Sequence, residues 1–450
     1  MRGREGGRPA SARARGREKR PARPPTPTLS FPSHETGHYF AIDIGGTNFR
    51  VVYVSLDDSP GGVAAVEMHD TPIPDAAYIC PAAGLFDMMA RGLLDFGRDI
   101  GVLGEGKPPP TVGFCFSFPC DQTALDAGVL LKLTKRFQNK GAVGTDPVEQ
   151  LRAAFARAGE PAAKVVALLN DSVGTLAGGR YTDPAVELGV ILGTGTNAAY
   201  VETATSVPKL DAAAANSLRG GRVVVNTEWG GFADDSLPTL DADRELDAAT
   251  PHAGEQLMEK QMSGMYLGEV ARRLLVSLAS SGVLFSGRVP KRLAEPGCVT
   301  TAHVARCDGD RSLALAATAA VLADALGATT TSYLDRRLVR RVCHLVALRS
   351  ARLFATAVAA LLRQIGRDAS AGPPVAAAVD GGVFEHYALY RGYATAALVE
   401  LLGRSAASRV RLNRVRDASS RGAAFLAAAA DHAAQHAGAA PAPARELVAV

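Results

Sequence analysis

Two glycine-rich turns, each following an apolar stretch, constrain the fold of this chain most. Tyr39-Phe-Ala-Ile-Asp-Ile44 predicts a strand, Gly45-Gly46 predicts a turn, and Phe49 to Leu56 predicts the returning strand. Leu188 to Leu192 predicts a second strand, which ends in Gly193-Thr-Gly-Thr196. Backbone N–H groups in glycine turns can approach phosphate closely. Each turn alone is a weak signal, because most strand–glycine turns are structural, and the pair makes both turns candidates for binding phosphate.

The remaining pattern alternates strands with helices. Asp146 to Gly159 predicts a helix, with Asp146 as its N-cap and Pro147 in its first turn. Residues 255–367 are mostly helical in pattern. Further short strands are predicted at 111–118, 165–169, 223–225 and 375–379. At 450 residues, the chain is long enough for two or three lobes. We therefore expect an α/β protein with at least two sheets.

Charge and cysteine usage exclude several classes of protein. The net charge of +4 comprises +7 from residues 1–30 and −3 from the rest, so the body is not built to bind nucleic acid. The six cysteines form no CxxC pair or zinc spacing, which is typical of reduced thiols in an intracellular protein. No apolar run reaches the roughly 18 residues that span a bilayer, so we expect no transmembrane segment.

Several polar residues follow predicted strands or sit in polar motifs, where a ligand site would form. Neither a GxxxxGK[ST] phosphate loop nor a GxGxxG dinucleotide motif is present. The candidates, which suit a ligand with many hydroxyl groups, are Ser117, Thr134, Lys135, Asn170, Asp171, Asn197, Glu228, Gln256 and Glu259.

With these motifs in place, the sequence resembles the hexokinase family, especially its plant branch, over roughly residues 40–430. The matching motifs include Asp43-Ile-Gly-Gly-Thr-Asn-Phe-Arg50, Asn170-Asp-Ser-Val-Gly-Thr-Leu-Ala-Gly-Gly-Arg-Tyr181, Asn226-Thr-Glu-Trp-Gly-Gly-Phe232 and Asp380-Gly-Gly-Val-Phe-Glu-His-Tyr387. The resemblance implies a two-lobed actin-like ATPase (ribonuclease H-like) fold, with mixed sheets, helices on both sheet faces and a ligand cleft between a small and a large lobe. It also implies ATP-dependent phosphorylation of glucose, mannose or fructose at the 6-hydroxyl, the entry step of glycolysis.

The resemblance assigns roles residue by residue. Asp171 would be the general base, and Lys135 would offset negative charge near the reacting oxygen. The other candidates named above would hold the sugar hydroxyls, and Asp43 would hold Mg²⁺ of MgATP through water. The ATP-binding set would be Asp43, Gly45, Gly46, Thr47, Asn48, Arg50, Gly193, Thr194, Gly195, Thr196, Gly381, Gly382 and Ser419.

The chain departs from the family pattern near its end. The family carries Asp-Gly-Ser-Gly-x-Gly-Ala-Ala, whereas this chain has Asp417-Ala-Ser-Ser-Arg-Gly-Ala-Ala424. If Ala418 and Ser420 occupy positions that need positive φ or close approach to ATP, their side chains weaken ATP binding. The alternative function is therefore a sugar-binding sensor or regulatory protein with weak catalysis.

The expected organisation has four parts. These are a disordered basic tail (1–35), a small domain (36–170), a large domain (171–432) and a C-terminal tail (433–450). We expect a monomer that binds hexoses and ATP or ADP. The cytosol is the expected location, and the alternative is a plastid or mitochondrion if the Arg-rich start is a transit peptide.

Overall fold

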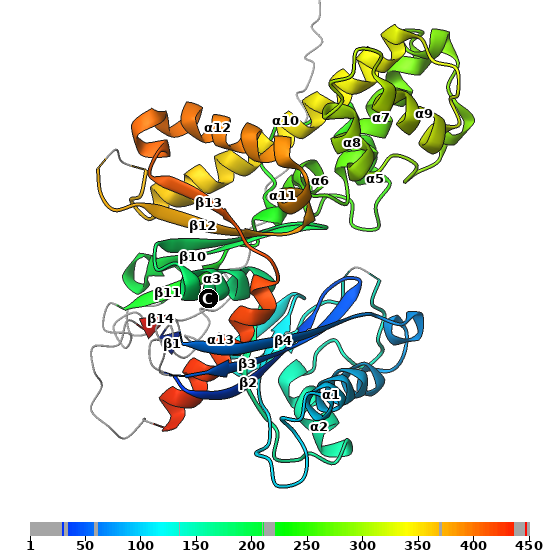
Figure 1. The fold of residues 1–450 in the computed structure, drawn as a ribbon. Helices are drawn as coiled ribbons and strands as arrows, with labels where there is room; N and C mark the ends of the chain where they lie inside the picture. Colours follow the sequence, from blue (N-terminus) through cyan, green and yellow to red (C-terminus); the bar gives the residue numbers. More distant parts are fainter. Residues whose placement is uncertain are drawn as a thin grey trace, which may run out of the picture.

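The computed structural model describes residues 29–30, 35–57, 62–134, 136–208, 210, 221–368, 371–435 and 446–447. Two five-stranded sheets with the same internal order form its framework (Figure 1). The first sheet has the order β4-β3-β2-β5-β8 and the second β11-β10-β9-β12-β13. In each sheet the central strand is antiparallel to the next strand in the chain and parallel to a later one. This duplicated α/β arrangement is the predicted fold class.

The first sheet positions Asp43 on its inner face. Its strands are β2 (Gly37–Ile44), β3 (Asn48–Leu56), β4 (Val63–Pro72), β5 (Thr111–Phe116) and β8 (Lys164–Leu169). Phe40 and Ile42 of β2 share a core with α1 (Ala82–Asp99) and α2 (Pro147–Arg157). Tyr39 and Ala41 belong to a different core, which the two lobes share. Since side chains alternate along a strand, Asp43 also faces the other lobe.

Most helices of the second lobe cover the face of the second sheet that points away from the first sheet. Its strands are β9 (Val186–Leu192), β10 (Thr196–Thr203), β11 (Arg222–Asn226), β12 (Val375–Asp380) and β13 (Val410–Arg414). Apolar side chains of β9 and β12 share one core with α7 (Leu267–Ser280), α8 (Thr301–Asp308), α9 (Ala316–Leu326), α10 (Tyr333–Gln364) and α12 (Ala388–Ala407). Shorter helices are α5 (Asp241–Ala248), α6 (Leu257–Met262) and α11 (Gly382–His386). Two-stranded pieces are formed by β6 (Cys120–Ala124) with β7 (Ala127–Leu130) and by β1 (Leu29–Ser30) with β14 (Glu446–Leu447).

Two helices join the lobes. Helix α3 (Asp171–Thr182) packs on β9, β10 and β12, whereas α13 (Ala418–Gln435) packs on β2, β3 and β5 as well as on α3 (Figure 1). The two helices cross almost backbone to backbone. A Cβ on Gly174 would lie 2.4 Å from the Ser419 carbonyl oxygen, and one on Gly422 would lie 1.9 Å from that of Gly174. The crossing therefore requires glycine at both positions.

The predicted strands lie where the sequence placed them, within a few residues. The predicted helix at Asp146 is also present, and the Asp146 side chain caps it by accepting the Val148 N–H. Helix α3 was not predicted, because its three glycines disfavour an isolated helix. The structure gives the reason for two of these glycines, which allow α13 to approach closely.

The structure also bears on the ends of the chain and on α10. Helix α13, which the prediction assigned to the large domain, packs mainly on the first sheet; the domain boundaries themselves stay a prediction. Most of the two predicted tails lies outside the described residues. Helix α10 is long and apolar enough to cross a membrane by length and composition alone. Half of its apolar stretch is buried, and the helix packs on α7, α8 and α12 of the second lobe.

Candidate active site

Polar residues gather where three parallel strands of the first sheet end. Strand β2 is paired with β5 in the register Asp43 to Cys115, and β5 with β8 in the register Cys115 to Leu169. Ser117 and Asn170 directly follow β5 and β8. Asp43, Ser117 and Asn170 therefore lie along one sheet edge, which is the usual place for a ligand site in an α/β fold.

Asp43 is a buried carboxylate held by hydroxyl groups. It is only 3% exposed, and its Oδ2 atom accepts hydrogen bonds from Ser419 Oγ at 2.9 Å and Ser420 Oγ at 2.7 Å. The Arg50 Nη1 atom lies 3.9 Å from the same oxygen. These three groups supply the partners that a buried charge requires.

The first glycine turn is tied to its surroundings through its backbone. The Gly45 N–H donates to the Asn48 carbonyl oxygen at 2.9 Å, which closes the turn. Tyr78 Oη donates to the Gly46 carbonyl oxygen at 3.0 Å, and the Ile73 N–H donates to that of Thr47 at 2.9 Å. Fixed carbonyl groups fix the peptide planes of the turn, which preorganises it for phosphate.

Arg50 lies among three carboxylates at the end of this turn. Its Nε atom is 3.4 Å from Asp70 Oδ2 and 3.7 Å from Asp417 Oδ1. Burial opposes the charge, but Asp43, Asp70 and Asp417 outweigh it and raise the Arg50 pKa. The Arg50 guanidinium is therefore already paired with the carboxylates around it.

The second glycine turn is built against β12. The Gly193 carbonyl oxygen accepts the Gly264 N–H at 2.8 Å, and that of Thr194 accepts the Met265 N–H at 3.2 Å. Gly381 has φ +117°, and a Cβ there would lie 2.5 Å from the Leu192 carbonyl carbon. Only glycine fits at that contact, which brings the turn after β9 next to the end of β12.

The start of α13 connects the two turns. While Ser419 and Ser420 bind Asp43, the Ala418 N–H donates to Asp380 Oδ2 at the end of β12, at 3.0 Å. Burial raises the pKa of Asp380 to about 6, although the Ala418 bond opposes the shift. Both predicted phosphate turns therefore adjoin the same helix terminus.

The backbone does not support the expectation that Ala418 and Ser420 occupy positions that need positive φ. Both residues lie in the first turn of α13, and neither has a positive φ. The positive φ of 53° falls on Asp417, and aspartate tolerates that region better than most residues. The two departures from the family pattern therefore add no φ strain to this loop.

A network of amides and carboxylates lies beside these turns. The Asn197 Nδ2 donates to Asn226 Oδ1 at 2.9 Å and to Glu228 Oε1 at 3.0 Å, and it lies 3.3 Å from Asn170 Oδ1. Asn170 caps α3 by accepting the N–H and hydroxyl of Ser172, each at 3.0 Å. The network thus links the end of β8 in the first sheet to β10 and β11 in the second.

Two further predicted residues, Glu259 and Gln256, lie beside this network. Glu259 Oε2 accepts the Thr196 N–H at 2.8 Å, so α6 is anchored to the second glycine turn. A Cβ on Gly230 would lie 2.7 Å from Gln256 Oε1, which places Gln256 against the turn that carries Glu228. Glu228 and Gln256 both have left-handed backbone, with φ of 49° and 55°. Non-glycine residues in that region are uncommon and cluster at functional sites.

The predicted sugar residues divide into three groups. Asn170, Asn197, Glu228, Gln256 and Glu259 are linked by the contacts above, and Asp171 is the first residue of α3, directly after Asn170. Ser117 lies at the same sheet edge, and Thr134 lies two residues from Lys132, whose Nζ reaches Glu255 Oε2 at 3.0 Å, next to Gln256. Lys135 lies outside the described residues.

Sequence reasoning missed three members of the site: Ser172, Asn226 and Ser420. Asn226 stood in a quoted motif, two residues before Glu228, so its place on the same strand end was a usable signal. Ser172 and Ser420 also stood in quoted motifs, but their partners could not be foreseen, because those partners lie 54 and 377 positions away.

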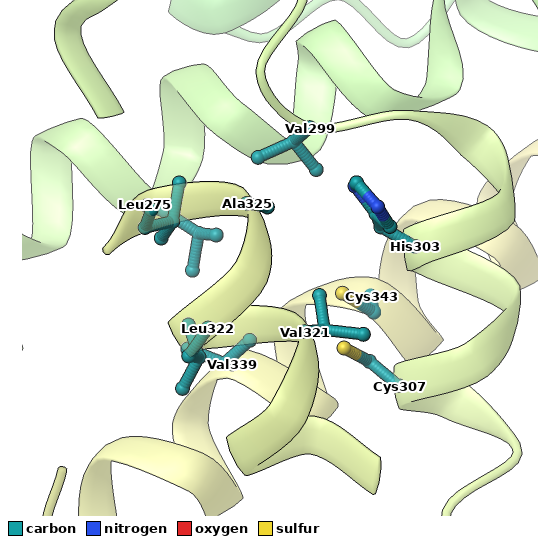
Figure 2. Close-up of a pocket in the computed structure, with 10 residues that line it drawn as sticks. Leu275, Val299, His303, Cys307, Val321, Leu322, Ala325, Val339 and Cys343 are labelled. Carbon is teal, nitrogen blue, oxygen red and sulfur yellow. The ribbon is translucent and has the colours of Figure 1, made fainter. Parts of the chain in front are cut away.

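The pocket in Figure 2 is separate from this site. It lies between α7, α8, α9 and α10, where residues such as Leu275, Val321 and Val339 line it together with the thiols of Cys307 and Cys343. Apart from the His303 imidazole and these thiols its lining is aliphatic, and it holds none of the predicted sugar residues. A polyhydroxylated ligand has no set of hydrogen-bond partners there.

The donor set fits a magnesium ion that is held through water. Among the described residues, no three His, Cys, Asp or Glu side chains converge to ligate a metal directly. The nucleotide side nevertheless has Asp43, Asp70 and Asp417 around Arg50, and the Asp380 carboxylate lies close enough to Asp43 and Asp417 to feel their charge. Mg²⁺ prefers oxygen ligands and retains several waters, so a site with few direct carboxylate ligands suits it.

Comparison with known proteins agrees with this geometry. Hexokinase family models match residues 15–181 and 187–429. "Hexokinase-4, chloroplastic" of Oryza sativa subsp. japonica is 40% identical over 412 residues, which are 90% of this chain and 80% of that protein. Hexokinase-1 of Arabidopsis thaliana is 40% identical over 400 residues, with 88% and 80% covered.

A solved structure matches as well. The Schistosoma mansoni hexokinase complexed with glucose has a TM-score of 0.78 and 32% identity, with 90% of this chain and 88% of that chain covered. The family models span most of the chain, and the relatives are matched over most of their length. The chain therefore belongs to the hexokinase family of enzymes that phosphorylate hexoses.

Proposed function

We propose that the protein transfers the γ-phosphate of MgATP to the 6-hydroxyl of glucose, and also accepts mannose and fructose. The observation that carries the proposal is the position of Asp171. It begins α3 directly beside the amide network, and α3 in turn crosses the start of α13, where Asp43 is held. A proton acceptor thus lies between the sugar-type network and the phosphate turns.

In this proposal Asp171 accepts the proton of the 6-hydroxyl as that oxygen attacks. A positioned base contributes about 10²- to 10⁴-fold to the rate. Asp171 Oδ1 accepts the Ser172 N–H at 2.8 Å, which limits rotation of the carboxylate. Lys135 is proposed to offset the negative charge that develops near the reacting oxygen.

The amide network supplies sugar recognition in the proposal. Asn170, Asn197, Glu228, Gln256 and Glu259 would bind the remaining hydroxyls, together with Ser117 and Thr134. Asn197 already holds Asn170 and Glu228 in place by hydrogen bonds, so a ligand without matching hydroxyls leaves polar groups of this shaped site unpaired. This explains how a polar pocket can select hexoses over other small molecules.

The two glycine turns would hold the nucleotide. Gly45, Gly46, Thr47 and Asn48 would bind phosphate oxygens from the first lobe and Gly193 to Thr196 from the second, and the charge of Arg50 lies at the end of the first turn. Asp43 would hold the metal through water, and Gly381, Gly382 and Ser419 would adjoin the nucleotide. The magnesium ion neutralises phosphate charge when bound.

The reading as a sensor without catalysis loses its main support. It depended on positive φ or close approach to ATP at Ala418 and Ser420; neither residue has positive φ, and close approach to ATP stays a prediction. A role in glucose sensing can coexist with catalysis, but no contact in the described chain argues for it separately.

Hexose-dependent release of ADP tests the proposal. Purified protein is titrated with glucose and mannose over a wide MgATP range, beside an Asp171→Ala control. Saturable turnover that vanishes in the control is the expected result. The single tryptophan, Trp229, donates to Thr196 Oγ1 at 3.0 Å and so reports sugar binding by fluorescence. Glucose binding without ADP at any MgATP level would overturn the kinase proposal.

For location, we propose the cytosol, with a plastid or mitochondrion as the alternative if residues 1–35 form a transit peptide. One matched relative is named as chloroplastic. Fluorescent fusions with and without residues 1–35 separate the two outcomes.

A further inference from the structure

The Asp43 carboxylate is held from one side by two adjacent hydroxyls of α13. Ser420 Oγ lies 2.7 Å and Ser419 Oγ 2.9 Å from the same atom, Asp43 Oδ2. All three residues are buried: Ser420 is 0% exposed, Ser419 6% and Asp43 3%. Hydrogen bonds from hydroxyls to an ionised carboxylate are short and roughly twice as strong as neutral ones. This pair is therefore a strong constraint on a buried anion.

The second of these hydroxyls is particular to this chain's sequence pattern. The pattern it resembles has glycine where Ser420 stands, so that pattern offers one hydroxyl where this chain has two. The position is helical and has no positive φ, so serine fits without backbone strain. What the exchange adds is a donor aimed at Asp43.

The two bonds also fix which oxygen stays available. A carboxylate oxygen has two lone pairs, and Asp43 Oδ2 accepts one hydrogen bond from Ser419 and one from Ser420. The Arg50 Nη1 atom lies 3.9 Å from the same oxygen. Rotation of the Asp43 carboxylate would break both bonds at once. The same helix turn binds Asp380 through the Ala418 N–H at 3.0 Å, so the two carboxylates keep a fixed relation across the lobes.

We propose that Ser420 is a positioning residue for phosphoryl transfer, which with Ser419 holds Asp43 in the orientation that meets the magnesium–nucleotide complex. This inference rests on the proposed role of Asp43. Phosphoryl transfer depends mostly on positioning and charge stabilisation, so a carboxylate free to rotate lowers the rate and weakens metal-nucleotide binding. Ser420 itself touches neither substrate.

The test compares the full-length protein with Ser420→Ala, Ser420→Gly and Ser420→Thr. Ser420→Ala and Ser420→Gly are expected to lower kcat/KM for MgATP about tenfold or more, as for loss of one charged hydrogen bond. They are also expected to shift the Mg²⁺ titration at fixed ATP to higher concentration. Glucose binding, followed by Trp229 fluorescence, stays unchanged. Ser420→Thr keeps the hydroxyl and is expected to recover part of the loss.

Ser350→Ala is the matched control. Ser350 is also fully buried, and its hydroxyl bonds to the Met262 carbonyl oxygen at 2.8 Å and to Tyr390 Oη at 2.9 Å, away from Asp43. It reports the cost of losing a buried hydroxyl in general. If both variants lose Tm and activity in parallel, with no shift in the Mg²⁺ titration, Ser420 has only a structural role and the proposal is wrong.

Asp43→Ala separates this inference from the proposed function. If Asp43→Ala abolishes turnover while Ser420→Ala and Ser420→Gly match the unaltered protein, Asp43 keeps its role and the Ser420 inference is overturned. If Asp43→Ala keeps full turnover and Mg²⁺ dependence, the role of Asp43 itself is wrong. Should Ser420→Ala fail to fold, Ser420→Gly carries the test, because the resembling pattern has glycine there.

Discussion

The network of amides and carboxylates around Asn197 and the two glycine turns are suited to bind their ligands in different ways. In the network, side chains satisfy one another: Asn197 alone reaches Asn170, Asn226 and Glu228. In the turns, backbone groups are the main candidates for binding phosphate. Close backbone contacts, such as that between Gly381 and Leu192, set the position of the turn. A side-chain site fails when a chemical group is lost, whereas a backbone site fails when a Cβ is added.

The largest effect is expected at Asp171. Asp171→Asn removes the proposed base but keeps the shape and the acceptor for the Ser172 N–H. We expect kcat to fall about 10²- to 10⁴-fold, with glucose binding retained in the Trp229 fluorescence titration. A variant that keeps more than a tenth of the original kcat would show that Asp171 only orients the hydroxyl.

The next effect tests the backbone site. Gly381→Ala places a methyl group 2.5 Å from the Leu192 carbonyl carbon and 2.6 Å from the Gly193 nitrogen, at φ +117°. We expect about 1–3 kcal/mol of lost stability, seen as a lower Tm, and a raised KM for MgATP. Gly392→Ala, whose Cβ would meet nothing within 4 Å, is the control and should not lower Tm. Equal Tm values for the two variants would contradict the close contact.

A smaller effect is expected in the side-chain network. Asn226→Ala leaves Asn197 Nδ2 and Ser172 Oγ without one acceptor and Glu228 Oε1 without one donor. A typical hydrogen bond contributes about 0.5–1.5 kcal/mol, so glucose should bind up to roughly tenfold more weakly, while KM for MgATP stays the same. A matching rise in both constants would mean that the two sites are not separable in this way.

The dependence of Tm on pH tests the raised pKa of Asp380, which lies beside the nucleotide turns. Burial raises its pKa to about 6 in the folded protein, against an ordinary value of about 3.9. Its raised pKa stabilises the fold at low pH, and that contribution is lost as pH rises from about 4 through 6. Without nucleotide and metal, Asp380→Asn should therefore gain Tm relative to the unaltered protein between pH 4 and 7. Parallel Tm curves would show that Asp380 does not titrate there.

The two kinds of site also differ in how far the sequence predicts them. Side-chain chemistry was predictable: Asn170, Asn197 and Glu228 were proposed from motifs and lie together. Backbone demands were not, because φ at Asp417 and at Ala418 depends on how α13 meets α3, and the φ argument against Ala418 and Ser420 was wrong. Helix α3 was missed for the same reason, since its glycines serve a contact with residues more than 200 positions away.

The smallest effect is expected at the rim of the side-chain site. Lys132 Nζ of the small lobe lies 3.0 Å from Glu255 Oε2 and 3.3 Å from His252 Nδ1 of the large lobe, next to Gln256. Glu255 has its pKa lowered by the Lys132 hydrogen bond, but the pair is exposed, and solvent and salt screen most of the attraction in such pairs. Lys132→Met should weaken glucose binding less than about fivefold and remove part of its dependence on salt. If the variant instead matches Asn226→Ala in its loss of affinity, Lys132 and Glu255 belong to the recognition network, and the distinction between that network and a solvated rim is wrong.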